Sequence, residues 1–164
     1  MLPALLAGMP LGAQEAQEYI AKVALMEKIT AYVDWPQGTA DRPFLLGVVG
    51  RTPFGDELDN HFQGKNLKGR AVRIRYFKGP EDIGPCDLLF VCASERDRLG
   101  SVLAKVRGRP VLTMADTSNF AGAGVMINLV RDGNRLAFEV NVTKAKESGL
   151  RMAAGFLKLS KVVE

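Results

Sequence analysis

Histidine and cysteine are scarce in this 164-residue sequence, which contains one histidine and two cysteines. Protein sites for transition metals usually combine several His, Cys or carboxylate ligands at short spacing. His61 has no second histidine and no cysteine at such a spacing. We therefore expect no metal site and interpret His61 as a solvated residue of a short helix.

The two cysteines, Cys86 and Cys92, are six residues apart on what we predict to be one strand. At ~3.3 Å per residue their Cα atoms would lie about 20 Å apart. A disulfide needs roughly 4.4–6.8 Å between Cα atoms. The sequence therefore predicts no disulfide within one chain, with Cys92 as a small core residue and Cys86 exposed at the edge of the strand.

Motifs of the common enzyme and nucleotide-binding classes are also missing. Gly50 and Gly55 do not have the G-x-G-x-x-G spacing of dinucleotide-binding loops, and no G-K-S/T sequence follows them. The sequence has no G-x-S-x-G motif that would indicate a nucleophilic serine, and it shows no pair of catalytic carboxylates. We expect neither an enzyme nor a cofactor.

The net charge of +4 is a mild excess, from 22 basic and 18 acidic residues, and the basic residues cluster only between Lys65 and Lys78. In a strand Arg73 and Arg75 share one face, while Val72, Ile74 and Tyr76 share the other. This pattern favours an outer strand with a solvated face over a nucleic-acid-binding patch, which would need interleaved aromatic residues. We expect no nucleic-acid partner.

Residues 1–13 form an uncharged, apolar block that ends in small residues. This composition is typical of the hydrophobic part of an export signal, and we predict cleavage after Ala13. The block has two prolines and is shorter than the roughly 20 residues of a membrane-spanning helix. The alternative is a packed or disordered N-terminal tail. Residues 15–164 are then expected to form a single exported domain.

Buried strands alternate with helical segments along the chain. The organising stretch, Leu88–Cys92, is continuously apolar, which indicates a central strand covered on both faces, although a short buried helix is the alternative. Phe44–Gly50 and Val111–Ala115 repeat the pattern, and Ala71–Lys78 is the outer strand. We predict an α/β, three-layer open sheet, mostly parallel in the order 2-1-3-4, with helices on both faces.

An antiparallel hairpin is predicted at one edge of this sheet, because Asp132-Gly133 separates the runs Val125–Val130 and Arg135–Val140. A single helix, Val142–Val163, is expected after the hairpin. Ser94 is predicted to be the N-cap of the helix that precedes Gly108.

The first predicted helix, Glu15–Asp34, is apolar around much of its circumference, and a second short helix is predicted at Glu57–Gln63. A helix of the first kind is expected to contact the sheet on one side and another protein on the other. The residues we assign to this partner or dimer surface are Tyr19, Val23, Met26 and Tyr32.

Polar residues follow three of the predicted strands, at the end of the sheet where open α/β proteins bind ligands. Turn chemistry and helix capping are the alternatives for the loop after Gly50 and for Asp116. The candidate ligand-binding residues are Arg51, Thr52, Phe54, Ser94, Asp116 and Thr117.

An ordered set of short segments resembles the YfiR-like family over essentially the whole chain after Gln14. The segments include Asp34-Trp35-Pro36, Leu46–Gly50 with Pro53-Phe54-Gly55, Cys86–Val91 with Ser94-Glu95, Val111–Asp116, Gly124–Leu129, and Phe138–Asn141 with Gly149-Leu150. The resemblance implies a small periplasmic α/β protein that, as a dimer, restrains a membrane-bound diguanylate cyclase without catalysing a reaction. Such restraint lowers cyclic di-GMP and biofilm formation.

Two positions depart from the family pattern. Family members can carry disulfide pairs, but only Cys86 lies at a family-like position here, and it has no partner unless it bridges two chains. Asp87 stands where the family typically has a histidine. A small-molecule or anion-binding module, or the sensory input domain of a larger signalling protein, is the alternative function.

Overall fold

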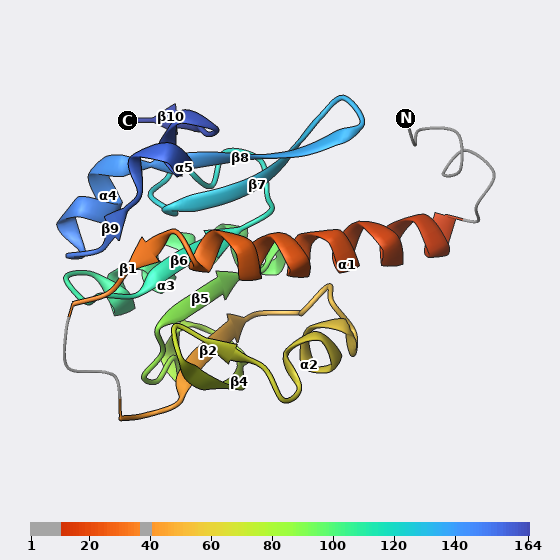
Figure 1. Ribbon diagram of the computed structural model, residues 1–164, viewed down its shortest axis with the longest axis horizontal. Coiled ribbons are helices and arrows are strands. Elements are labelled where there is room, and N and C mark those ends of the chain that lie inside the picture. Colours follow the sequence, from red (N-terminus) through yellow and green to blue (C-terminus); the bar gives the residue numbers. More distant parts are fainter. Residues whose placement is uncertain (1–10, 37–40) are drawn as a thin grey trace.

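The computed structural model describes residues 11–36 and 41–164, and most of the predicted export segment, residues 1–13, lies outside this range. Among the described residues one eight-stranded sheet has the order β10-β8-β7-β6-β5-β2-β4-β3, shown in Figure 1. Its strands are β2 (Phe44–Val49), β3 (Asn66–Leu67), β4 (Arg70–Phe77), β5 (Leu88–Val91), β6 (Leu112–Ala115), β7 (Ile127–Asp132), β8 (Arg135–Asn141) and β10 (Lys161–Val163).

The predicted strand order 2-1-3-4 is confirmed, because β4, β2, β5 and β6 are neighbours in that order and pair in parallel. Strand β7 pairs in parallel with β6, and β8 pairs antiparallel with β7 as the predicted hairpin. The sheet does not end there, since β10 pairs in parallel with β8 and forms the outermost strand. The α/β class and the mostly parallel sheet are thus as predicted.

Side chains on the two faces of the central strands enter two separate cores. Leu46, Leu88 and Phe90 point to the face covered by α1 (Leu11–Thr30) and α2 (Glu57–Phe62). Leu89 and Val91 point to the opposite face, covered by α3 (Leu99–Val106). Burial on both faces explains why these strands show no alternation of apolar and polar residues.

The first helix ends at Thr30 and not at Asp34. Tyr32 N donates to Ile29 O at 2.9 Å, which closes the last turn, and Val33–Asp34 then forms the short strand β1. This strand pairs antiparallel with β9 (Arg151–Met152) as a two-stranded sheet of its own. Figure 1 shows α1 crossing in front of the large sheet.

The prediction of one long helix over Val142–Val163 is wrong. The segment contains α4 (Val142–Glu147), β9, α5 (Ala154–Lys158) and β10. Asn141 is the N-cap of α4, and its side chain accepts from Lys144 N. The helix ends before Gly149, which has φ +83°. A residue at that φ cannot continue an α-helix, so the apolar residues before and after Gly149 cannot belong to one continuous helix.

Ser94 is not a helix N-cap, which corrects a second prediction. After β5 the chain forms a 3₁₀-helix, η2 (Ala93–Arg98), whose capping position is Cys92, and α3 follows directly from it. A further 3₁₀ turn, η1 (Pro80–Asp82), precedes β5.

Candidate functional site

A buried ion pair joins the middle of α1 to the carboxyl end of β6. The Lys22 Nζ atom lies 2.8 Å from Asp116 Oδ2, and the two side chains are 9% and 7% exposed. Lys22 reaches this position because it is three residues after Tyr19 and four before Met26, on the stripe of α1 that packs on the sheet. Asp116 therefore binds the helix above it.

The surroundings of Lys22 favour its charged form. Burial lowers the pKa of Lys22, but the hydrogen bond and charge of Asp116, together with Glu18, outweigh burial and leave the pKa raised. Lys22 Nζ also lies 3.4 Å from Glu18 Oε1 and 4.6 Å from the Tyr19 ring centroid. Glu18 in turn pairs with Arg131 of β7 at 3.3 Å. Charges on α1 thus contact both β6 and β7.

The structure brings candidate ligand residues of two different loops, Arg51 and Ser94, into direct contact. Arg51 N donates to Ser94 Oγ at 2.9 Å, so the loops after β2 and β5 meet at the carboxyl ends of their strands. Gly50, with φ +100°, allows this approach, since a Cβ atom there would lie 2.5 Å from Ser94 Oγ. The Arg51 side chain itself is exposed.

Thr52 and Phe54 form a turn that covers the end of the sheet. Thr52 Oγ1 accepts from Phe54 N at 3.2 Å, which is ordinary turn chemistry. Phe54 is 2% exposed, with its ring 5.6 Å from Tyr19 and 4.7 Å from Phe90. Phe120, also 2% exposed, is buried on the other face. Both aromatic rings are packed, which disfavours a deep crevice at these strand ends.

Thr117 is held by its backbone. Its N–H donates to Asn128 Oδ1 at 3.2 Å, and its carbonyl accepts from Asn128 Nδ2 at 2.8 Å. The buried hydroxyl of Thr117 has no hydrogen-bond partner among the described residues. The side chain of Asn128 in β7 therefore holds the backbone of Thr117 in place next to Asp116.

The surroundings of His61 differ from those that the sequence predicts. Across residues 11–36 and 41–164, no cluster of three or more His, Cys, Asp or Glu side chains has the geometry of a metal site. His61 contacts Glu27 of α1, with Nε2 to Oε2 at 2.5 Å, and so is not the solvated residue that the sequence predicts. It joins α2 to α1.

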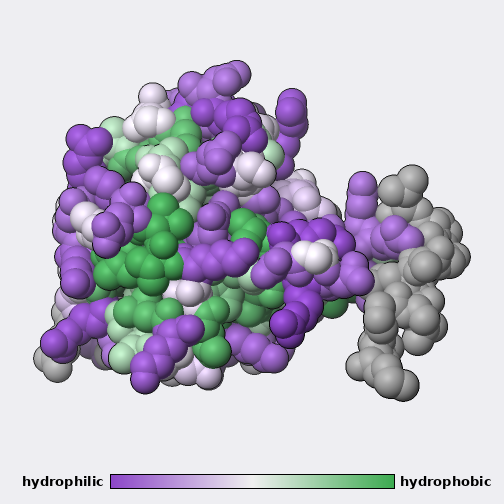
Figure 2. Space-filling model, turned by 90° about the horizontal axis from the view of Figure 1, so that it is seen from above, coloured by the Kyte–Doolittle hydropathy of each residue, from purple (hydrophilic) through white to green (hydrophobic). Residues whose placement is uncertain are grey.

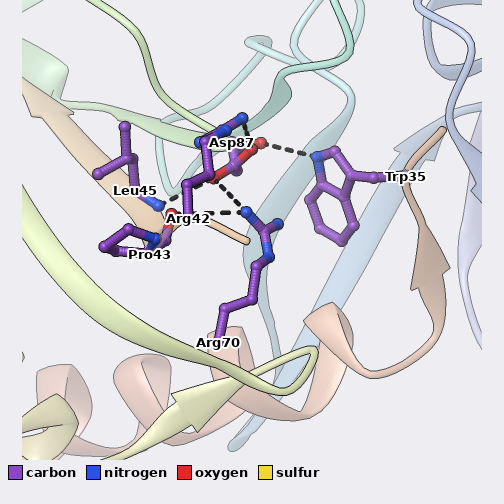
Figure 3. A network of polar contacts seen from close by, with 6 residues as sticks. All are labelled: Trp35, Arg42, Pro43, Leu45, Arg70 and Asp87. Atoms are coloured by element: carbon purple, nitrogen blue, oxygen red, sulfur yellow. Dashed lines mark hydrogen bonds and ion pairs between the residues drawn. The ribbon is translucent and has the colours of Figure 1, made fainter. Parts of the chain in front are cut away.

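A second buried charge cluster, which the sequence analysis missed, lies at the amino end of β5 (Figure 3). Asp87 is 1% exposed and accepts from Nη2 and Nη1 of the Arg42 guanidinium, at 2.7 and 3.0 Å. Arg70 Nη1 and Leu45 N donate to the same carboxylate at 3.3 and 2.9 Å. The backbone carbonyl of Asp87 accepts from Trp35 Nε1 at 3.1 Å. Asp87 thereby connects β5 with β2, β4 and the segment after α1.

Comparison with known proteins identifies the family. A family model described as YfiR/HmsC-like matches residues 19–161. The chain belongs to the YfiR/HmsC-like family. Its membership agrees with the resemblance of the short segments from Asp34 to Leu150.

Two solved structures are similar to this YfiR/HmsC-like chain in fold. An ABC domain in complex with L-Trp from Streptococcus pneumonia has a TM-score of 0.59 at 13% identity, and covers 88% of this chain. A conserved domain protein from Vibrio cholerae O1 biovar El Tor has a TM-score of 0.62 at 10% identity, over 89% of this chain. In both cases the chain spans 60% of the other protein's length. At these identities the likeness concerns the fold alone.

The partner surface predicted on the first helix of this family member needs correction. Val23 and Met26 are 1% and 0% exposed and belong to the core beneath α1, so they offer no surface to another protein. Tyr19 is half-buried against Phe54. Only Tyr32 of the four predicted residues is exposed, at 51%.

The two most exposed large hydrophobic side chains among the described residues lie elsewhere in this YfiR/HmsC-like fold. Leu159 is 79% exposed and Val162 is 54% exposed, in the segment from α5 to β10. Tyr32 stacks on Phe156 of α5 with ring centroids 5.8 Å apart, so it adjoins the same segment. Figure 2 shows hydrophobic side chains gathered on the face that carries α5 and β10. We call Tyr32, Leu159 and Val162 the C-terminal apolar surface.

The two cysteines are free and buried, so the prediction of no disulfide between them is confirmed and the prediction of an exposed Cys86 is wrong. Cys86 is 6% exposed because it belongs to the same core as Phe77 of β4 and Leu89 of β5. Burial raises the pKa of Cys86 to about 11 and that of Cys92 to about 12. Neither thiol has the exposure or the acidity of a reactive cysteine.

Proposed function

We propose that this chain is a periplasmic regulatory protein that binds a membrane-bound diguanylate cyclase and restrains it, which lowers cyclic di-GMP. The observation that carries the proposal is membership of the YfiR/HmsC-like family over residues 19–161. The mode of action is binding without catalysis, followed by release when a signal shifts the population toward a form that binds the cyclase less well.

The architecture of the strand ends supports a binding role. The position where open α/β sheets usually bind ligands is covered by α1, through the Lys22–Asp116 ion pair, and by the packed ring of Phe54. Because the strand ends are covered, we expect this chain to recognise its partner through its surface. The small-molecule alternative at Arg51, Thr52 and Ser94 finds less support, because Thr52 and Ser94 already accept backbone hydrogen bonds.

The C-terminal apolar surface is the proposed contact with the cyclase. Interface energy comes mainly from a few well-exposed large side chains that become buried on binding. Leu159 and Val162 are such side chains, and Tyr32 adds an aromatic ring beside them. This surface replaces the one predicted on α1 at Val23 and Met26.

Localisation and domain extent remain part of the proposal. No described helix combines the length and hydropathy needed to cross a bilayer. We propose export directed by residues 1–13 and a folded domain over 15–164, acting as a homodimer. Fusing residues 1–20 to a reporter that is active only outside the cytoplasm tests the export step.

The function is tested in cells that lack the gene and are complemented with variants. The wild-type chain is expected to lower cyclic di-GMP and to capture a diguanylate cyclase from solubilised membranes. L159S/V162S is expected to lose both effects while its thermal unfolding is unchanged, because both side chains are exposed. I20S is the matched control, since Ile20 is 45% exposed on α1.

Two results would contradict the proposal. Unchanged cyclic di-GMP on deletion, together with no cyclase in the captured material, would overturn the regulatory function. Full activity of L159S/V162S would leave the regulatory function standing and reject the C-terminal apolar surface as its contact.

A further inference from the structure

A cavity of about 230 Å³ lies at the opposite end of the sheet from the predicted ligand residues. It is bordered by the C-terminal end of α3, by the start of β6, by the segment that leads into β7, and by α4. Its lining residues are Leu103, Val106, Arg107, Gly108, Thr113, Ala123, Gly124, Met126, Lys144, Glu147 and Ser148. The cavity therefore connects helices that follow different strands.

The inner wall of the cavity is apolar, and its hydroxyl groups are already satisfied. Val106 and Met126 are 4% and 6% exposed, and Leu103 packs against the same core as Val106. Thr113 Oγ1 accepts from Met126 N at 2.9 Å, and Ser148 Oγ donates to Ala145 O at 2.7 Å. An apolar group is consequently the better match for the interior.

The rim of the cavity carries two cations and one anion. Lys144 Nζ pairs with Glu147 Oε2 at 3.1 Å, so these two charges balance. Within the described residues, no acceptor lies within hydrogen-bonding distance of the Arg107 guanidinium. The cavity thus combines an apolar interior with the exposed guanidinium of Arg107, which has no partner among the described residues. The cavity is smaller than the ~300–1,000 Å³ of pockets for drug-sized ligands.

We propose that this cavity binds a small monocarboxylate with an apolar tail, whose carboxylate pairs with Arg107. The planar guanidinium presents its donors in a fork that matches the two oxygens of a carboxylate. The tail lies against Leu103, Val106 and Met126. Such a ligand contacts α3 and α4 at once and stabilises their present arrangement.

Carboxylate binding in this cavity is independent of the proposed regulation of a cyclase, so it is tested on the purified chain alone. Isotope-labelled protein is titrated with hexanoate and followed by amide chemical shifts, with acetate, inorganic phosphate and hexylammonium as comparison probes. Hexanoate is expected to saturate with a Kd on the order of 1 mM, as suits so few atoms. Shift changes are expected at the residues that line the cavity.

Two variants separate the charge from the shape of the site. R107Q is expected to weaken hexanoate binding about 10-fold or more, because a charged hydrogen bond is lost. A123L is expected to weaken it by filling the cavity while keeping Arg107. R73Q removes an exposed arginine of β4 far from the cavity lining and is expected to leave the affinity unchanged.

Several results would overturn the proposal. These are absence of saturable hexanoate binding, equal binding of hexylammonium, acetate or phosphate, shift changes away from the cavity, or an unchanged affinity in R107Q. Because the readout is direct binding, a negative result here leaves the proposed restraint of a cyclase untouched, and failure of that restraint leaves this site intact.

Discussion

Lys22 and Asp116 are each buried next to the other's charge, so removing one partner leaves an uncompensated ion in the core. We expect K22M to lower the free energy of unfolding by about 3 kcal/mol. The double variant K22M/D116L is expected to recover most of this loss, since no charge is then left buried. Urea unfolding of the single and double variants measures the difference.

Lys28, an exposed residue of α1, provides the control for that experiment. K28M is expected to change the free energy of unfolding by no more than about 0.5 kcal/mol, as surface substitutions usually do. If K22M and K22M/D116L were equally destabilised, the ion pair would not be the cause.

The thiols give a second prediction at this scale. At pH 8 both cysteines are expected to stay unmodified by a thiol-specific reagent in the native protein, since they are buried and their pKa values are raised to about 11 and 12. Two thiols per chain are expected to react after denaturation. Labelling of Cys86 in the native protein, or a disulfide-linked dimer under mild oxidant, would contradict this expectation.

For single residues, the sequence predicted which polar residues lie at the strand ends, but it did not predict which of them form an ion pair. Arg51 and Ser94 were expected to meet, and they do, because their strands are neighbours. Lys22 was overlooked although a lysine inside an apolar helical stripe signals a buried counter-charge. That counter-charge is Asp116, which the sequence predicts as a ligand-binding or capping residue. The two residues are 94 positions apart in the chain, a separation that no local pattern reveals.

At the scale of elements, α2 is tied to α1 through Glu27, which contacts His61 at 2.5 Å and Lys65 at 3.3 Å. Burial raises the pKa of Glu27, but hydrogen bonds from His61 and Lys65 outweigh it and leave the pKa below its ordinary value of 4.5. The contribution to stability is therefore present above about pH 4.5 and is lost as pH falls through the folded-state pKa.

This sign predicts how wild type and E27Q differ with pH. The wild type is expected to be more stable than E27Q at neutral pH, and the difference in free energy of unfolding is expected to shrink as pH falls below about 4.5. Denaturant unfolding at a series of pH values measures it. A difference that is constant with pH would show that the carboxylate charge of Glu27 does not contribute.

Gly149 separates α4 from the C-terminal segment, and its φ of +83° favours glycine. We expect G149A to lower the free energy of unfolding by about 1 kcal/mol, because a Cβ atom is strained in this conformation. G155A is the matched control, since Gly155 lies in α5 with open space around it and is expected to be neutral or slightly stabilising. Equal effects in thermal unfolding would contradict this interpretation.

The parallel strands were predictable because each is a short, continuously apolar run, and burial on both faces requires that pattern. The C-terminal segment was not, because its apolar residues have a helical spacing while the backbone at Gly149 turns the chain away. The two-residue strands β1 and β9 have no sequence signal of their own. They form because Val33 and Met152 are brought together by the larger fold, where Ala153 N also donates to Tyr32 O at 2.9 Å.

For the whole molecule, the C-terminal apolar surface can serve a cyclase or a second copy of the chain. We expect it to serve the cyclase, so L159S/V162S is expected to keep the sedimentation behaviour of the wild type while cyclase capture is lost. Analytical ultracentrifugation, referred to the chain mass of 17.8 kDa, measures this. A shift of the variant toward smaller species would assign the surface to self-association.

Helix α1 is fastened to its surroundings by charged side chains at positions 18, 22 and 27, which reach β7, β6 and α2 respectively. Since a helix rises 1.5 Å and turns 100° with each residue, sliding or rolling it by a single step would separate all three contacts together. A force applied along α1 would therefore strain the three contacts at the same time.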